Sequence, residues 1–179
     1  MKGDQGNKWD QLSHYIEELM EKFNVPGVSI GILNSGEVLS AGFGITSVEN
    51  PLPITNKTLF QIGSITKTFT CTAIMRLMEK GKIDLDAPIR SYFPGFKVSD
   101  EETASTVTIR HLLTHTSGWL GDFFIDTGPG KDAMAKYADR MSELVQVSPL
   151  GSIVSYNNSG YYLLGHIIEL ITEKTYEEA

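Results

Sequence analysis

The stretch FQIGSITK, residues 60–67, leads into the strongest helical pattern in the chain. Apolar side chains recur at helical spacing from Phe69 to Met78. Gly81 follows them, and glycine is the residue most typical of the position just after a helix. The pattern therefore predicts a helix from Ser64 to Lys80.

The first turn of this helix carries two residues with complementary chemistry. Ser64 and Lys67 are separated by i to i+3 spacing, which places their Cβ atoms on one helix face, about 5–6 Å apart. A serine hydroxyl is a poor nucleophile until a base takes its proton, and the lysine amine is a candidate for that base. The Ser64 N–H, at a helix N-terminus, is also placed to bind an oxyanion. The structural alternative makes Ser64 a helix cap and Lys67 a solvated charge.

The N-terminal part predicts a helix followed by a hairpin. Residues 9–23 have apolar side chains at helical spacing, residues 28–33 and 37–43 read as strands, and Asn34-Ser35-Gly36 between them is typical of a tight turn. Residues 51–58 are expected to form a loop. Because an isolated two-stranded ribbon is marginal in water, we expect the sheet to be completed by a further portion of a longer chain or by another copy of this chain.

The C-terminal half is predicted to be helical and holds a second cluster of polar residues. We expect a short helix over residues 109–114 capped by Thr108, a helix over 133–147, and a last helix beginning at Asn158 or Ser159. Tyr156 lies just before that last helix. A tyrosine near a lysine cation is more easily held as phenolate, and an amide such as Asn158 both donates and accepts hydrogen bonds. In the structural alternative, Asn158 caps the helix and Tyr156 is a core aromatic.

Three ordered blocks resemble the serine β-lactamase and penicillin-binding protein superfamily, closest to class C β-lactamases and their esterase and D-aminopeptidase relatives. The blocks are residues 60–67, LLTHTSG at 112–118 and YNN at 156–158 with the tail to Gly165, and VPGV at 25–28 matches as well. The resemblance implies an α+β fold of the β-lactamase/transpeptidase type, with an antiparallel sheet flanked by helices and a mostly helical subdomain. It spans nearly the whole chain.

The resemblance also implies the role of each site residue. Ser64 is the expected acylated nucleophile, Lys67 its proton partner, Tyr156 a general base, and Asn158 and Gly63 substrate-positioning residues. Which of the lysine and tyrosine is the acylation base is left open. The implied function is hydrolysis of a β-lactam, D-amino-acid peptide or small ester through an acyl-serine intermediate, without cofactor or metal.

One family motif is missing, and this affects the expected organisation. No K-[ST]-G or H-x-G sequence follows Tyr156. We therefore expect residues 1–179 to be the N-terminal portion of a single domain that lacks its C-terminal strands, with 1–58 as helix and hairpin and 59–179 as the mostly helical part. A catalytically inert penicillin-recognising or interaction module is the alternative function.

Composition and two decoy motifs exclude other classes of function. A net charge of −7 with scattered basic residues disfavours nucleic-acid binding. No apolar run is long enough to span a membrane and no secretory signal is evident. We therefore expect a soluble chain that is cytoplasmic, or periplasmic or extracellular if a leader was removed.

Two sequence patterns resemble motifs of other enzyme classes. Ser29 fits the G-x-S-x-G pattern of a nucleophile elbow but lies in a predicted strand. His111 and His115 have zinc-ligand spacing but lack the H-E-x-x-H glutamate, and His115 is expected to be a hydrogen-bonded structural residue.

Overall fold

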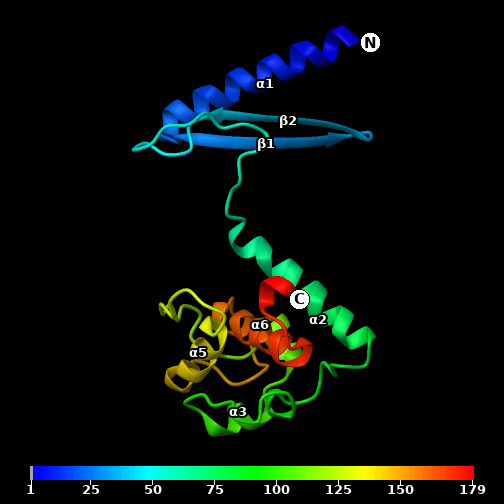
Figure 1. Cartoon of the computed structure of the whole chain (residues 1–179), viewed down its shortest axis with the longest axis vertical. Coiled ribbons are helices and arrows are strands. Elements are labelled where there is room, and N and C mark those ends of the chain that lie inside the picture. Colours follow the sequence, from blue (N-terminus) through cyan, green and yellow to red (C-terminus); the bar gives the residue numbers. More distant parts are fainter. Residues whose placement is uncertain (1) are drawn as a thin grey trace. The chain divides into compact units, whose positions relative to one another are not determined.

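The computed structural model divides the chain into two compact units, the first ending at Gln61 and the second beginning at Ile62 (Figure 1). The structure describes residues 2–179, with side chains from Lys8 onward. The sequence places the boundary between residues 58 and 59, inside the loop that the structure assigns to the first unit. Among the described residues, no helix combines the length and apolar character that a membrane span requires.

The first unit contains one helix and one antiparallel hairpin, as the sequence predicts. Helix α1 spans Lys2–Phe23, strand β1 spans Gly27–Asn34 and strand β2 spans Glu37–Gly44. The turn between the strands places Ser35 at φ 50° and Gly36 at φ 87°. Two successive positive φ values are the requirement of the tight hairpin turns whose twist matches that of the strands.

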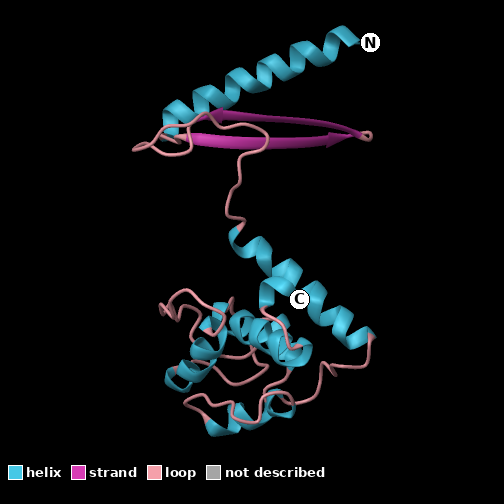
Figure 2. Ribbon diagram, in the orientation of Figure 1, coloured by secondary structure: helices cyan, strands magenta, loops and turns pink. Residues whose placement is uncertain are grey.

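One face of this hairpin lies against α1, which runs along the two strands (Figure 2). Val28, Ile30 and Ile32 alternate with more exposed neighbours along β1, as expected for a strand with one covered face. A hollow between helix and hairpin is lined by Trp9 of α1 and by Ile32 of β1, among others. The alternation of the sequence therefore sets which face of the hairpin the helix covers.

The second unit is built from helices and irregular segments. Its helices are α2 (Thr66–Glu79), α3 (Glu101–Thr106), α4 (Ile109–Leu113), α5 (Ala133–Arg140) and α6 (Asn158–Thr172), with 3₁₀ turns at Gly63–Ile65, Ile89–Ser91, Met141–Glu143 and Tyr176–Glu178. Within residues 62–179, all of which the structure describes, no segment is assigned as a strand, and the magenta arrows of Figure 2 lie only in the first unit. The two units together make an α+β chain.

Helix α6 lies at the centre of the second unit. It packs against α2, α4 and α5. Its buried face presents Leu163, Leu164, Ile167 and Ile168 to a core that also contains Phe96 and Trp119. Burial of this many apolar side chains is the main source of stability for such a unit, and the helix buried in this way carries part of the candidate site at its N-terminal end.

Two elements differ from the prediction. The helix expected over residues 133–147 ends at Arg140, continues as the 3₁₀ turn Met141–Glu143 and then becomes extended, with Gln146 bridged to Trp119. Met141 and Leu144 prolong the helical spacing, but both are buried from a non-helical backbone. Helix α3 was not predicted, because most of its side chains are polar. Its N-cap Asp100 accepts a hydrogen bond from the Thr103 N–H and was the available signal.

Candidate active site

Ser64 lies in the 3₁₀ turn that leads into α2, with its side chain exposed. The preceding residue, Gly63, has φ 52°, a left-handed conformation that side chains other than glycine rarely adopt. A Cβ atom at Gly63 would meet nothing within 4 Å. Glycine is therefore favoured at this position by the backbone conformation, which turns the chain so that Ser64 faces the pocket.

The structural alternative for Ser64 is wrong. The N-cap of α2 is Ile65, and no side chain caps this helix. The Ser64 hydroxyl instead accepts two hydrogen bonds, from Lys67 Nζ at 3.3 Å and from the Tyr156 hydroxyl at 2.7 Å. The helix start thus leaves the serine oxygen available to these two side chains.

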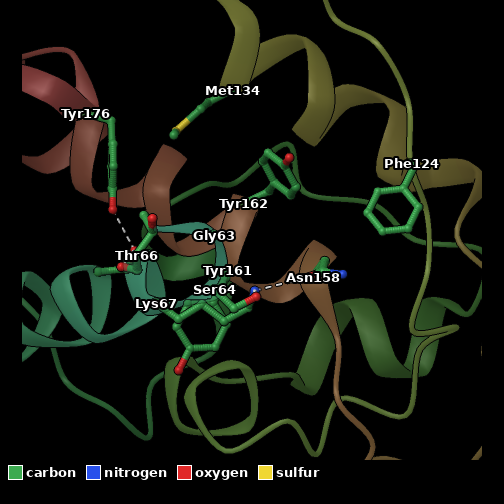
Figure 3. Close-up of a pocket in the computed structure, with 11 residues that line it drawn as sticks. Gly63, Ser64, Thr66, Lys67, Phe124, Met134, Asn158, Tyr161, Tyr162 and Tyr176 are labelled. Atoms are coloured by element: carbon green, nitrogen blue, oxygen red, sulfur yellow. Dashed lines mark hydrogen bonds between the residues drawn. The ribbon is translucent and has the colours of Figure 1, made fainter. Parts of the chain in front are cut away.

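Lys67 connects the two halves of the predicted site. Its ammonium donates to Asn158 Oδ1 at 2.8 Å (Figure 3) as well as to Ser64. The same nitrogen lies 4.8 Å from the ring centroid of Tyr156 and 5.6 Å from that of Tyr161. An ammonium above aromatic faces is stabilised by their electron density. Lys67 is half-buried and held in place, and is not the solvated charge of the structural alternative.

Tyr156 reaches Ser64 from a loop 92 residues further along the chain. The adjacent Lys67 side chain, followed by the contact with Ser64, holds the pKa of the Tyr156 phenol below its usual value. These contacts favour the phenolate, since a nearby positive charge and a hydrogen-bond donor both stabilise an anion. A phenolate at this position would accept the Ser64 proton along the existing 2.7 Å contact.

The adjacent residues Asn157 and Asn158 make different contacts. Asn157 is the N-cap of α6. Its side-chain oxygen accepts from the Gly160 N–H at 2.8 Å, and its side-chain nitrogen donates to the Leu120 carbonyl at 2.7 Å. Because Asn157 satisfies the helix end, Asn158 is free to bind Lys67. The alternative in which Asn158 caps the last helix is therefore wrong.

A pocket of about 340 Å³ opens beside the nucleophile. One wall carries Ser64, Lys67 and Asn158, and the remaining lining is mostly aromatic and apolar (Figure 3). The lining residues that the sequence analysis did not name are Thr66, Thr70, Phe124, Met134, Tyr161, Tyr162 and Tyr176. Helical spacing from the named residues was a usable signal for some of them, since Tyr161 and Tyr162 follow Asn158 by i+3 and i+4, and Thr70 follows Lys67 by i+3.

The middle block, residues 112–118, lies next to the Tyr156 loop. The Asn157 backbone N–H donates to His115 Nδ1 at 3.1 Å, which agrees with the expectation of a hydrogen-bonded structural histidine. Partial burial and the Lys67 charge hold the pKa of His115 below its usual value. His111 forms a capping box with Thr108 at the start of α4. Each histidine is thus engaged in a separate contact.

The decoy serine lies elsewhere in the fold. Ser29 is in the interior of β1, opposite Gly42 of β2, and belongs to the first unit. A nucleophile elbow requires a sharp turn between a strand and a helix. The backbone at Ser29 is that of a paired strand, so the G-x-S-x-G pattern has no elbow geometry here.

Comparisons with known proteins agree with the three sequence blocks. Residues 12–179 match the Beta-lactamase family. Penicillin-binding protein 4 of Amycolatopsis lactamdurans is 36% identical over 164 residues, which cover 92% of this chain and 43% of that protein. Protein flp of Staphylococcus aureus strain N315 is 30% identical over 174 residues, covering 93% of this chain and 34% of that protein. The chain spans less than half the length of these relatives.

Solved structures of similar proteins also match nearly all of this chain and less than half of their own length. The octameric penicillin-binding protein homologue from Pyrococcus abyssi superposes with a TM-score of 0.77 at 36% identity, covering 94% of this chain and 40% of that one. A class C beta-lactamase from Rhodobacter sphaeroides gives a TM-score of 0.70 at 29% identity, covering 92% of this chain and 44% of that one. The fold is therefore of the β-lactamase/transpeptidase type. With the family match extending over residues 12–179, the chain belongs to the beta-lactamase family.

Proposed function

We propose that this chain carries the nucleophile and proton-transfer residues of a serine hydrolase that acts on an amide or ester through an acyl-Ser64 intermediate. The observation that carries the proposal is the convergence of Lys67 and Tyr156 on Ser64 Oγ, at 3.3 Å and 2.7 Å. A hydroxyl contacted by two groups able to exchange protons is the arrangement required of an activated serine.

The reaction proceeds in two stages. Ser64 Oγ attacks the carbonyl carbon while its proton passes to the Lys67–Tyr156 pair. The C–N or C–O bond then breaks, and the leaving nitrogen or oxygen takes that proton. In the second stage water attacks the acyl-serine, gives a proton to the same pair, and the pair returns it to Ser64 Oγ as the acid is released. Asn158 holds Lys67 through Oδ1, and its amide NH₂ is available to a substrate carbonyl.

The residues that line the pocket indicate which kind of substituent the substrate carries. Of the lining residues, only Lys67 carries a charge, and the walls include Phe124, Met134 and Tyr162. Apolar walls favour an uncharged, apolar substituent, because a charged group there would lose its hydration, and the Lys67 ammonium already donates to Ser64 and Asn158. We therefore favour β-lactams, D-amino-acid peptides or small esters whose scissile carbonyl carries such a substituent.

Covalent labelling tests the proposal directly. The protein, at its full natural length, is incubated with a fluorescent penicillin or a fluorophosphonate and its intact mass is measured. We expect one adduct, which is lost in Ser64→Ala and retained in Ser29→Ala, a matched control in the decoy motif. Absence of a fluorophosphonate adduct on the natural protein, or an adduct that survives Ser64→Ala, contradicts the proposal.

The second candidate is a module that recognises penicillin without turning it over. The similarity to penicillin-binding protein 4 and to the octameric penicillin-binding protein homologue favours it. The two candidates differ in the fate of the acyl-serine. A hydrolase returns to its unlabelled mass as the β-lactam is consumed, whereas a recognition module keeps a stoichiometric Ser64 adduct.

A further inference from the structure

His115 adopts an unusual backbone conformation beside the candidate site. Its φ is 57°, in the left-handed region, although it is not a glycine. A residue with a Cβ atom is strained in this conformation, which persists only where its surroundings hold it. The loop that carries Tyr156 supplies two of the hydrogen bonds that hold His115.

Two backbone hydrogen bonds join His115 to this loop, one on each side of Tyr156. The Ser155 N–H donates to the His115 carbonyl at 2.8 Å, and the Asn157 N–H donates to His115 Nδ1 at 3.1 Å. The two residues that flank Tyr156 are therefore both bound to a single residue. This arrangement fixes the position and direction of the backbone from which the Tyr156 side chain extends.

The imidazole ring also contacts the Tyr156 ring. Their centroids are 4.6 Å apart with an interplanar angle of 35°, and the centroid of the Tyr161 ring lies 5.2 Å from that of His115 with an angle of 33°. Tyr161 is anchored in turn, because its hydroxyl donates to the Leu113 carbonyl at 3.1 Å. These tilted aromatic contacts restrict the ring of Tyr156, a residue that is 52% exposed.

The Nδ1 contact requires a neutral imidazole. A nitrogen that accepts a hydrogen bond must have a free lone pair, so the ring proton is on Nε2. The titratable groups that face His115 are Lys67 of α2, Tyr156 of the loop and Tyr161 of α6. With a neutral ring at His115, Lys67 is the one positive charge among the described residues that acts on the Tyr156 phenol.

We propose that His115 is a positioning residue, which holds the Tyr156 hydroxyl on Ser64 Oγ by binding the backbone on both sides of Tyr156. The inference rests on the proposed acyl-serine function. His115 does not itself contact Ser64 among the described hydrogen bonds, so its effect on the reaction passes through Tyr156. A displacement of about 1 Å in such a group can slow a reaction about 100-fold.

A matched pair of variants tests the Nδ1 contact. In His115→Asn the side-chain Oδ1 lies close to the position of Nδ1, and asparagine tolerates a positive φ. In His115→Gln the acceptor lies one carbon further out. We expect the asparagine variant to acylate within about fivefold of the natural protein, and the glutamine variant to be slowed about 10- to 100-fold with KM little changed. Equal rates in the two variants overturn the inference.

A double-mutant cycle separates positioning from a general structural effect. If His115 acts through the Tyr156 hydroxyl, His115→Gln should have almost no further effect on acylation in a Tyr156→Phe background. Full additivity of the two rate losses overturns the inference, since it means that His115 acts independently of that hydroxyl. Thermal unfolding of each variant verifies that folded proteins are compared.

Different experimental outcomes contradict the proposed function and the proposed role of His115. If the natural protein forms no fluorophosphonate adduct at Ser64, the proposed function is wrong. If the adduct forms at an equal rate in the natural protein and in His115→Gln, the function stands and the role of His115 is wrong.

Discussion

Removal of the Tyr156 hydroxyl is the sharpest test of the site chemistry. Tyr156→Phe keeps the ring that stacks on His115 at 4.6 Å and lies below the Lys67 ammonium at 4.8 Å. It deletes only the oxygen that contacts Ser64 Oγ at 2.7 Å. The substitution therefore isolates proton transfer from the packing of the loop.

We expect Tyr156→Phe to have a large effect on the acylation rate and a small effect on the free energy of unfolding. General acid–base catalysis contributes about 10²- to 10⁴-fold, equivalent to about 2.7–5.4 kcal/mol of activation free energy. Tyr156 is 52% exposed, and removal of its hydroxyl leaves the exposed Ser64 Oγ in contact with Lys67, so the free energy of unfolding should change by less than about 0.5 kcal/mol. We expect a slowing of acylation by at least about 100-fold in a protein of unchanged stability.

The pH dependence supplies an independent measurement on the same variant. Lys67, followed by Ser64, holds the pKa of Tyr156 below its usual value, so the phenolate forms at lower pH than in a free tyrosine. If the phenolate is the base, the acylation rate rises with pH as Tyr156 loses its proton. Tyr156→Phe should lack this rise, because the titrating group is absent.

Acylation is measured as the rate at which the fluorophosphonate or penicillin adduct accumulates. Tyr15→Phe is the matched control, since Tyr15 lies on α1 in the first unit and is 56% exposed. It should acylate at the natural rate. A Tyr156→Phe protein that acylates as fast as this control, with an unchanged pH profile, removes Tyr156 from the mechanism.

Three further substitutions separate the structural residues from the chemical ones. Asn157→Ala should lower the free energy of unfolding by about 1–3 kcal/mol in urea denaturation, because it removes the cap of α6 and a buried hydrogen bond. Asn158→Leu should instead leave the melting temperature nearly unchanged and slow acylation about 10-fold or more, because Lys67 loses its 2.8 Å acceptor. Phe124→Ala should lower kcat/KM about 10-fold for a phenylacetyl ester and leave an acetyl ester nearly unaffected, because Phe124 lines the pocket and the larger group has more apolar surface to bury against its walls.

Local spacing predicted the contact between Ser64 and Lys67 but left open whether the pair is catalytic or structural. Ser64 and Lys67 are neighbours on one helical turn, so their contact follows from the i to i+3 geometry alone. Tyr156 is different. It is separated from Ser64 by 92 residues, and no periodicity relates positions so far apart. Only the resemblance to a known family linked the two blocks before the structure brought them together.

The division of tasks between Asn157 and Asn158 could not be predicted from the sequence. Both are asparagines, both precede an apolar helical pattern, and either is a good N-cap by residue type. The choice depends on where the helix begins and on what lies behind it. The carbonyl of Leu120, in an irregular loop, accepts from the Asn157 side chain and so buries it. Long-range contacts of this kind leave no local pattern.

The predicted end of the helix over residues 133–147 is wrong for a related reason. Met141 and Leu144 continue the apolar spacing of Tyr137, and all three are buried. Apolar spacing indicates which side chains are buried, not which backbone conformation buries them. A 3₁₀ turn followed by an extended segment buries Met141 and Leu144 as well as a helix would. The bridge between Gln146 and Trp119 then holds the extended segment, and Trp119 is too distant in sequence to influence the local prediction.

The first turn of α6 explains how one short segment serves both stability and chemistry. Asn157 is 1% exposed and caps the helix, and Ser159 is fully buried within hydrogen-bond distance of the Tyr137 hydroxyl, at 2.9 Å. The residues directed to the pocket are Asn158 and Tyr161, on another side of the same turn. Because a helix turns by about 100° per residue, adjacent positions face different surroundings. Substitutions of Asn157 and Ser159 should therefore affect mainly unfolding, whereas substitution of Asn158 should affect mainly acylation.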